Sequence, residues 1–153
     1  MPNDNPRSTA RIGGHPIHPM LVSIPIACFV LTLLSDLAYA ATANMQWANM
    51  SVWLLTVGLV VSIFVVLAGL IDFFGDRRIP RLRDAWIHGL GNALALIIAI
   101  INAFVHSRDA WTSVVPLGLL LSFLTVAILA CTAWFGGELV YRHGVGMASA
   151  DRT

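Results

Sequence analysis

Four long apolar runs alternate with short polar segments along the chain, and this pattern predicts four helices. The runs cover about residues 19–42, 51–75, 85–105 and 110–141. Each is long enough to cross a hydrocarbon layer of about 30 Å, which takes roughly 20 helical residues. Backbone groups in lipid must be paired within the segment, so each run predicts a transmembrane helix. Because the connections are short, we expect an all-α, integral-membrane four-helix bundle in up-down order.

The two ends of the chain are polar. Residues 1–14 are rich in Pro, Asn, Ser and Gly, which predicts a flexible tail before a membrane domain at 15–147. Residues 148–153 form a second short tail. A residue before proline disfavours helix, whereas proline is accepted at the first helical position, so we expect the first helix to begin at Pro19.

The first apolar run also resembles a secretory signal, with Ala38-Tyr39-Ala40 as a small-residue cleavage site. The run contains Pro25 and Asp36, is longer than a usual signal core and is followed by more membrane segments. We therefore expect the first helix to remain uncleaved.

Composition supports a membrane protein. Hydrophobic residues make up 58% of the 153 residues and charged residues 11%, whereas a soluble domain has about 25% charged residues. Lipid is therefore the main expected partner. Since no basic cluster with interleaved aromatic residues is present, we expect no nucleic-acid binding. Cys28 and Cys131 each lie within an apolar run, so we expect no disulfide.

Arginine placement predicts the orientation in the membrane. With the N-terminus inside, a single arginine, Arg108, lies outside. Cytoplasmic loops of membrane proteins carry an excess of basic residues, so both termini should face the cytoplasm. The arginines on the inner side are Arg7, Arg11, Arg77, Arg78, Arg81, Arg83, Arg142 and Arg152.

Small and polar residues recur at helical spacing on every predicted helix and should face one another in the bundle. The ionisable residues among them are costly in a membrane and usually mark function or a paired site. Asp72 either pairs with a nearby arginine or takes part in a proton or ligand path. Asp36 and His106 should meet near the outer surface, most simply in a hydrogen bond. Glu138 precedes Arg142 by four residues and could pair with it.

Four of the five histidines fall at the inner face of the predicted bundle: His15, His18, His88 and His143. Imidazole nitrogens bind iron, zinc or copper, and two opposed histidines give the six-coordinate haem of electron-transfer cytochromes. We therefore predict a b-type haem or metal site with His18 and His88 as ligands and His15 or His143 as substitutes.

Neighbouring residues suit such a site. Gly89 and Gly91 leave room beside His88, Asn92 could orient a ring or a bound water, and Arg81 or Arg83 could meet haem propionates. Haem is favoured over zinc because no cysteine is close by and Asp84 is the single carboxylate placed to help. Covalent c-type attachment is excluded because the chain has no Cys-x-x-Cys-His motif.

Several segments carry a family resemblance. They are Gly14-His15-Pro16-Ile17-His18-Pro19-Met20-Leu21-Val22 with Pro25-Ile26, Gly69-Leu70-Ile71-Asp72, His88 with Asn92, and the ending from Gly136 to Gly146. Over about residues 13–147 the chain resembles a family of bacterial inner-membrane proteins catalogued as domain of unknown function 2231. The resemblance implies a small membrane protein of four helices and supplies no settled activity.

Three functions remain open at this point. The first is a haem-binding cytochrome that passes electrons between a membrane partner such as quinol and a redox partner at the cytoplasmic face. The second is a non-enzymatic accessory or scaffold subunit of a larger membrane complex. The third is transport of a metal ion or proton, which the lack of an inverted repeat disfavours. The sequence leaves open whether the protein is an enzyme and whether copies of the chain associate, and no motif of soluble hydrolases is present.

Overall fold

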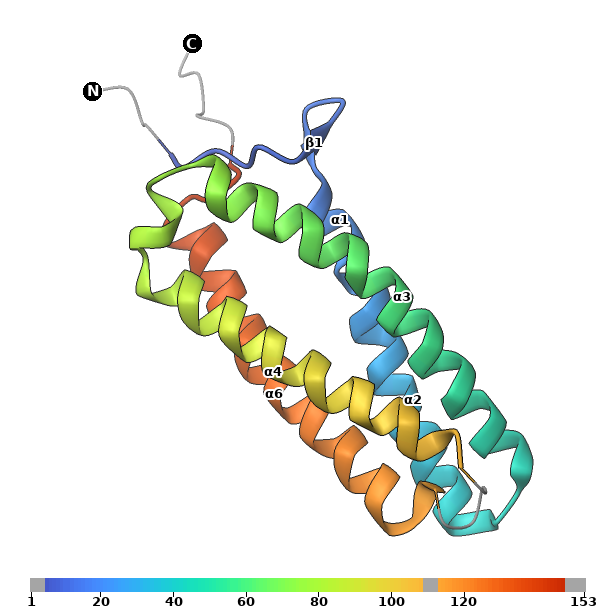
Figure 1. Cartoon of the computed structure of the whole chain (residues 1–153). Helices are drawn as coiled ribbons and strands as arrows, with labels where there is room; N and C mark the ends of the chain where they lie inside the picture. The colour runs from blue at the N-terminus through green and yellow to red at the C-terminus, as the bar shows by residue number, and fades with distance from the viewer. Residues whose placement is uncertain (1–4, 109–112, 148–153) are drawn as a thin grey trace.

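Four long helical spans form an elongated bundle (Figure 1) in the computed structural model, which describes residues 5–108 and 113–147. The first span is divided into α1 (Ile17–Leu21) and α2 (Ser23–Thr42). The second and third are α3 (Met45–Gly75) and α4 (Arg83–His106), which a short turn, η1 (Ile79–Arg81), connects. The last begins as a wider turn, η2 (Val114–Gly118), and continues as α6 (Leu119–Tyr141).

All four spans are long and apolar enough to cross a membrane, so the expected all-α membrane bundle is confirmed. The predicted start of the last helix at 110, the predicted tail at 148–153 and Arg152 lie outside the described residues.

The first span begins at Ile17, two residues before the predicted start, and is interrupted at Val22. Pro25 explains the interruption, because proline has no N–H to donate to the carbonyl of Leu21 four residues earlier. The interruption leaves α1 as a separate short helix at the end of the bundle, and this helix carries His18.

The second span begins at Met45, six residues before the predicted start. The side chain of Asn44 accepts a hydrogen bond from the backbone N–H of Gln46 at 2.9 Å, which caps the first turn of α3. Ala43 ends α2 in a left-handed conformation with φ of 51°. At 1.5 Å per residue the 31 residues of α3 span about 46 Å, longer than the hydrocarbon layer.

The segment before α1 has fixed contacts, whereas the sequence pattern predicts a flexible tail there. Strand β1 (Arg11–Ile12) pairs antiparallel with β2 (His15–Pro16). Gly13 and Gly14 join the strands with positive φ angles of 57° and 84°, which glycine adopts without steric cost. Upstream of β1, residues 7–10 hydrogen-bond to the last turns of α3.

The spans run alternately up and down, and the closest-packed neighbours are α2 with α3 and α4 with α6. Residues 5–11 and 142–147 meet at one end of the bundle, here called the terminal end (Figure 1). The loops at 43–44 and 107–108 lie at the opposite end, here called the far end. Between the two ends, Phe29, Leu55 and Ala99 form a buried apolar cluster.

One buried carboxylate joins all four spans towards the far end. Asp36 of α2 is fully buried. Its Oδ1 accepts from the hydroxyl of Ser51 on α3 at 2.6 Å and lies 3.0 Å from Nε2 of His106 on α4. Its Oδ2 accepts from the hydroxyl of Ser122 on α6 at 2.6 Å. Polar groups in hydrocarbon find their partners on neighbouring helices, so this cluster fixes the four spans relative to one another.

The Asp36 cluster is neutral overall. Nδ1 of His106 lies 3.1 Å from the carbonyl oxygen of Asn102, so Nδ1 is the donor there. A single proton is then shared between Nε2 and Asp36, as an ion pair or as two neutral groups. Asn102 also donates to the hydroxyl of Ser122 at 2.8 Å. Its Oδ1 is the one enclosed side-chain N or O atom among the described residues without a hydrogen-bond partner.

We predict that Asp36→Ala destabilises the bundle by about 3 kcal/mol or more, because it leaves a buried imidazole and two hydroxyls without an acceptor. Thr56→Ala is the control. The Thr56 hydroxyl is exposed and donates to the carbonyl of Val52 in its own helix, so its removal should cost about 0.5 kcal/mol or less. Unfolding by SDS in mixed micelles measures both, and equal midpoints for the two variants would contradict the assigned role.

Candidate functional site

The rings of His18 and His88 lie next to each other at the terminal end of the bundle. His18 is on α1 and His88 on the second turn of α4. The ring centroids are 6.1 Å apart and the ring planes are inclined by 74°. Both residues are half-buried. The fold thus brings together the two histidines that the sequence singles out as first-choice ligands.

A hydrogen bond from each ring to a backbone carbonyl determines its tautomer. Nδ1 of His18 lies 3.0 Å from the carbonyl oxygen of Val65 on α3, and Nδ1 of His88 lies 2.9 Å from that of Thr132 on α6. A carbonyl oxygen can only accept, so both Nδ1 atoms carry the hydrogen. Within the described residues Nε2 of neither ring has a hydrogen-bond partner. The Nε2 lone pairs are therefore free to bind a ligand.

Asn92 supports His88 from the next turn of α4. Its Nδ2 donates to the backbone carbonyl of His88 at 2.7 Å and also lies 3.3 Å from Nδ1 of that ring. Its Oδ1 accepts from the hydroxyl of Thr132 at 3.2 Å. The amide group therefore connects α4 to the residue on α6 whose carbonyl holds the ring.

A glycine lies four residues after each of these carbonyls. In an α-helix the residue at i+4 donates to the carbonyl of residue i, and its Cβ points back towards that carbonyl. A Cβ at Gly69 would lie 3.1 Å from Nδ1 of His18, and a Cβ at Gly136 would lie 2.9 Å from Cε1 of His88. Both positions are glycine because each imidazole occupies the space of a side chain.

The other glycines near His88 have different surroundings. A Cβ at Gly89 would have no heavy atom within 4 Å, and a Cβ at Gly91 would clash with the side chain of Thr132. Gly91 therefore allows α4 to approach α6, rather than leaving room beside His88 as we expected.

The remaining histidines do not join this pair. His15 is exposed, and its Nδ1 donates to the carbonyl oxygen of Gly13 at 3.1 Å. Nε2 of His143 lies 2.9 Å from Oδ2 of Asp84, which connects the segment after α6 to the first turn of α4. The glycine-rich ending turns towards α4 rather than towards His18. His106 lies in the Asp36 cluster on the same helix as His88, 18 residues further on.

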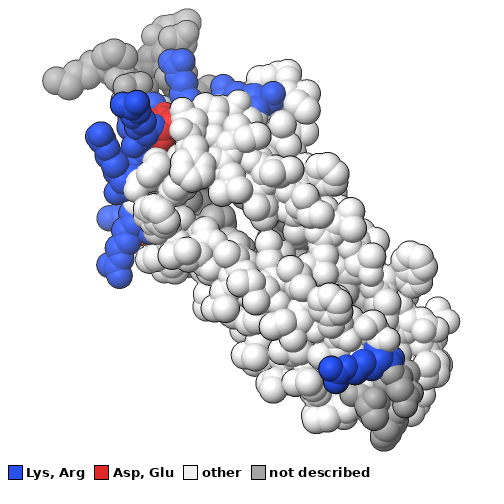
Figure 2. Space-filling model, in the orientation of Figure 1, with Lys and Arg blue, Asp and Glu red and all other residues white. Residues whose placement is uncertain are grey.

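The charged side chains gather at the two ends of the molecule, and most arginines lie at the terminal end (Figure 2). Arg81 and Arg83, the candidate propionate partners, are exposed just before and at the start of α4. Glu138 and Arg142 approach to 3.7 Å, as their spacing of four residues predicts. Arg108 lies at the far end.

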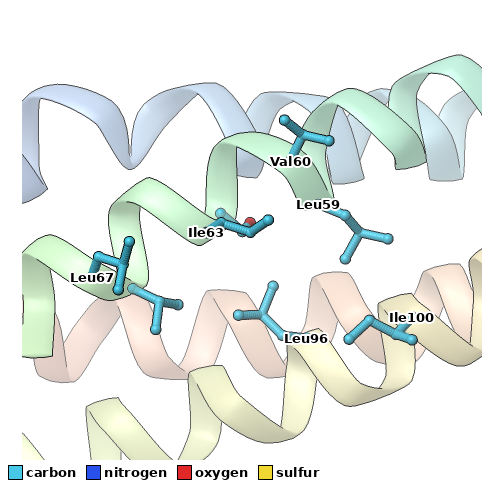
Figure 3. A pocket seen from close by; sticks show the side chains of 8 residues that line it. Leu59, Val60, Ile63, Leu67, Leu96 and Ile100 are labelled. Atoms are coloured by element: carbon cyan, nitrogen blue, oxygen red, sulfur yellow. The ribbon is translucent and has the colours of Figure 1, made fainter.

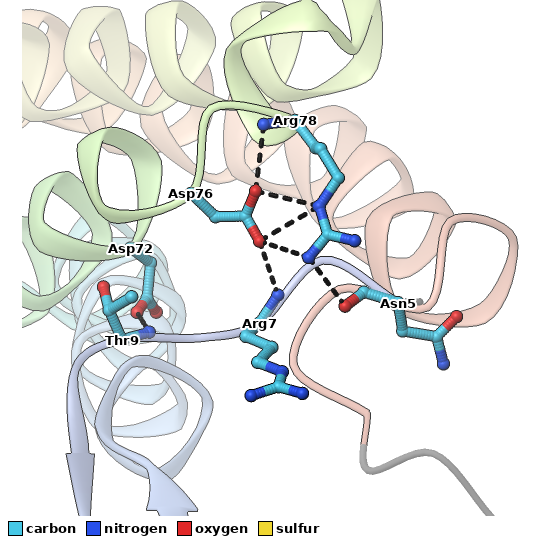
Figure 4. Close-up of polar contacts among 6 residues, drawn as sticks. All are labelled: Asn5, Arg7, Thr9, Asp72, Asp76 and Arg78. Atoms are coloured by element: carbon cyan, nitrogen blue, oxygen red, sulfur yellow. Dashed lines mark hydrogen bonds and ion pairs between the residues drawn. The ribbon is translucent and has the colours of Figure 1, made fainter. Parts of the chain in front are cut away.

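Asp72 binds the N-terminal segment instead of an arginine. Its Oδ1 accepts from the hydroxyl of Ser8 at 2.9 Å and from the backbone N–H groups of Thr9 and Ala10, both at 2.7 Å (Figure 4). Three donors on one oxygen fix this segment against the end of α3. Asp72 thus has a structural role as a receptor for backbone N–H groups.

Asp76 takes the arginine that the sequence assigns to Asp72. Its carboxylate accepts from the guanidinium of Arg78, with a closest distance of 2.7 Å, and from the backbone N–H of Arg7 at 2.9 Å (Figure 4). Arg78 also donates to the carbonyl oxygen of Asn5 at 3.0 Å. The hydrogen bonds from the Arg78 side chain hold the pKa of Asp76 well below its usual range.

A groove of about 400 Å³ opens between α3 and α4 (Figure 3). Its lining is aliphatic apart from Ser62, and it begins one residue beyond Val65, whose carbonyl holds His18. The groove carries no ionisable group. The residues seen lining it in Figure 3 are Leu59, Val60, Ile63, Leu67, Leu96 and Ile100.

The described part of the chain contains no group of three or more His, Cys, Asp or Glu side chains placed to hold a metal ion. A tetrahedral zinc site needs such a set. Two imidazoles are instead the protein ligand set of a six-coordinate haem. The geometry therefore favours a cofactor that brings its own equatorial ligands.

These features define a small four-helix membrane protein with a histidine pair between its helices. The chain belongs to the family described as predicted membrane protein (DUF2231), whose model matches residues 14–149. No curated protein and no solved structure matches the chain.

The depressed pKa of Asp76 predicts how pH affects the N-terminal segment. A carboxylate with a lowered folded-state pKa stabilises the fold at pH values above the unfolded-state pKa, about 3.9. This contribution is lost as the pH falls through the folded-state pKa. We expect the hydrogen-exchange protection factor of the Arg7 amide to be constant from about pH 8 to pH 5 and to fall below about pH 4.

Asp76→Asn is the control for this measurement, because the amide removes the titrating group at the same position. In this variant the protection of the Arg7 amide should be reduced at neutral pH and should no longer change as the solution is acidified. Loss of protection in the unaltered protein between pH 7 and pH 5 would contradict the assignment.

Proposed function

We propose that this protein is a b-type cytochrome of the inner membrane, in which His18 and His88 bind one haem iron from opposite sides. The bound haem would supply one-electron chemistry by cycling between ferric and ferrous iron. The observation that carries the proposal is the pairing of two imidazoles inside an apolar bundle, each with a free Nε2.

The spacing of the rings fits this ligand. A bond between a metal and an imidazole nitrogen is about 2 Å long, and the nitrogen lies about 1 Å from the ring centre. Two imidazoles on opposite sides of one iron therefore have centroids about 6 Å apart. The observed separation of 6.1 Å supports shared ligation.

The hydrogen bonds at Nδ1 support the same assignment. A ligating histidine almost always donates its other ring N–H to a carbonyl or carboxylate, which fixes the ring and raises the basicity of the ligating nitrogen. Val65 and Thr132 provide the carbonyls for this purpose. Asn92 strengthens the link between His88 and Thr132.

The surroundings suit a haem with its propionates towards the terminal end. The exposed guanidinium groups of Arg81 and Arg83 could neutralise the propionates as charge-assisted donors. Since most arginines lie at this end, we place it and both termini in the cytoplasm. Electrons would then pass between a quinol in the membrane and a redox protein at the cytoplasmic face.

Proton or metal transport is disfavoured by the middle of the bundle. The polar groups of the Asp36 cluster and of the histidine pair lie on opposite sides of the apolar layer that contains Phe29, Leu55 and Ala99. A chain of polar groups across the membrane is interrupted there. The accessory-subunit alternative predicts that alanine at His18 and His88 leaves function intact.

We expect purified protein reconstituted with haem to show the Soret and α bands of a low-spin cytochrome. His18→Ala and His88→Ala should each lose the low-spin bands, because one axial ligand is missing. His15→Ala and His143→Ala are matched controls that remove an imidazole at the same end of the bundle and should keep the spectrum. Absorption spectra of the oxidised and reduced forms measure the effect.

Circular dichroism and size-exclusion chromatography establish that each variant is folded. A colourless unaltered protein after reconstitution would overturn the proposed function. Retention of the low-spin bands in both His18→Ala and His88→Ala would overturn the ligand assignment.

A further inference from the structure

The two halves of the chain place equivalent residues at equivalent positions. His88 follows His18 by 70 residues, and five buried residues of α2 have a buried residue of α4 at this same separation. α4 has six buried residues in all, so the shared separation accounts for nearly its whole buried face. The pairs are Pro25 and Ala95, Phe29 and Ala99, Thr32 and Asn102, Ser35 and Val105, and Asp36 and His106.

The second helix of each half repeats in the same way, with a separation of 67 residues. Helical periodicity alone would align the buried faces of α3 and α6 in phase, but it would not also align the groups that contact the histidines. Both sets coincide here. The buried pairs are Ser51 and Gly118, Leu55 and Ser122, Gly58 and Thr125, and Val65 and Thr132, and the same separation relates Gly69 to Gly136.

The contacts of each histidine are therefore the same in both halves. In each half, a histidine of the first helix donates through Nδ1 to a carbonyl of the second helix and lies against the glycine four residues further on. At the far end, Ser51 contacts Asp36, and its counterpart Gly118 lies against His106. Both halves begin at the terminal end, so the repeat is parallel rather than inverted.

We infer that the chain consists of two copies of one helical hairpin around a pseudo-two-fold axis through the His18–His88 site, with Gly69 and Gly136 as the residues that position the two rings. This inference rests on the proposed haem function. A ligand on such an axis is met by the same groups on both faces, which suits a planar tetrapyrrole.

The positioning has a spectroscopic consequence. The two ring planes are inclined by 74°, and each is held by a carbonyl on one side and a glycine on another. In low-spin ferric haem, crossed axial imidazoles give a strongly anisotropic electron paramagnetic resonance signal, whereas parallel imidazoles give a rhombic one. The structure therefore predicts the strongly anisotropic signal.

The test is the electron paramagnetic resonance spectrum of the oxidised, haem-reconstituted full chain and three alanine variants. Gly136→Ala and Gly69→Ala should shift the signal away from that of the unaltered protein, because the added methyl group displaces the ring. The shift should be larger for Gly136→Ala, whose Cβ would lie 2.9 Å from the ring, than for Gly69→Ala at 3.1 Å.

Gly137→Ala is the matched control. It is the next residue of α6, and its Cβ would make ordinary contacts with the ring of Tyr141, the nearest at 3.8 Å. Its spectrum should equal that of the unaltered protein. Gly69→Ala is the milder substitution and keeps the test available if Gly136→Ala does not fold.

The outcomes separate the two proposals. An unaltered protein without low-spin haem bands overturns the proposed function and this inference with it. Low-spin bands with a rhombic signal, or with glycine variants that match Gly137→Ala, overturn the positioning role and leave the haem function standing. A strongly anisotropic signal that both glycine variants shift supports both.

Discussion

The hydrogen bond between an imidazole and a backbone carbonyl of the neighbouring helix is the interaction on which this structure depends. A membrane interior offers no water to polar side chains, so a histidine there must find its partner in the protein. His18 and His88 find it in carbonyls that glycine leaves accessible on α3 and α6. One bond thus fixes the ring, selects its tautomer and joins two helices, and it leaves the second ring nitrogen free.

The two ends of the bundle resolve the same constraint differently. At the far end the paired positions hold an acid and a base, Asp36 and His106, which satisfy each other through a shared proton. At the terminal end the equivalent positions hold two histidines, each already satisfied through Nδ1. Equal groups with free lone pairs leave room for a third component between them. The far end is therefore suited to stability and the terminal end to binding.

Periodicity and composition predict the number of spans, their class and the end at which the histidines lie, because the hydrocarbon layer fixes the length and apolarity of each span. The partners of those histidines could not be predicted. Thr132 acts through its backbone carbonyl rather than its hydroxyl, and a carbonyl leaves no mark on the residue type. The glycines four residues on are the available signal, and Gly69 and Gly136 stand out once a histidine is known to lie against each.

Interactions of the polar segments were the least predictable. Residues 5–11 read as a tail by composition, yet Asp72 and Asp76 receive their backbone N–H groups. Such contacts depend on where the end of α3 lies in space rather than on local sequence. The same reason explains why His143 meets Asp84 instead of joining the histidine pair.

The central claim is that His18 and His88 together bind one iron. Near-infrared magnetic circular dichroism of oxidised protein, purified from cells supplied with haem, tests it most directly because the charge-transfer band reports the axial ligands. The account predicts the band of iron with two imidazole ligands. A band of any other ligand pair, or purified protein that contains no haem iron, would contradict it.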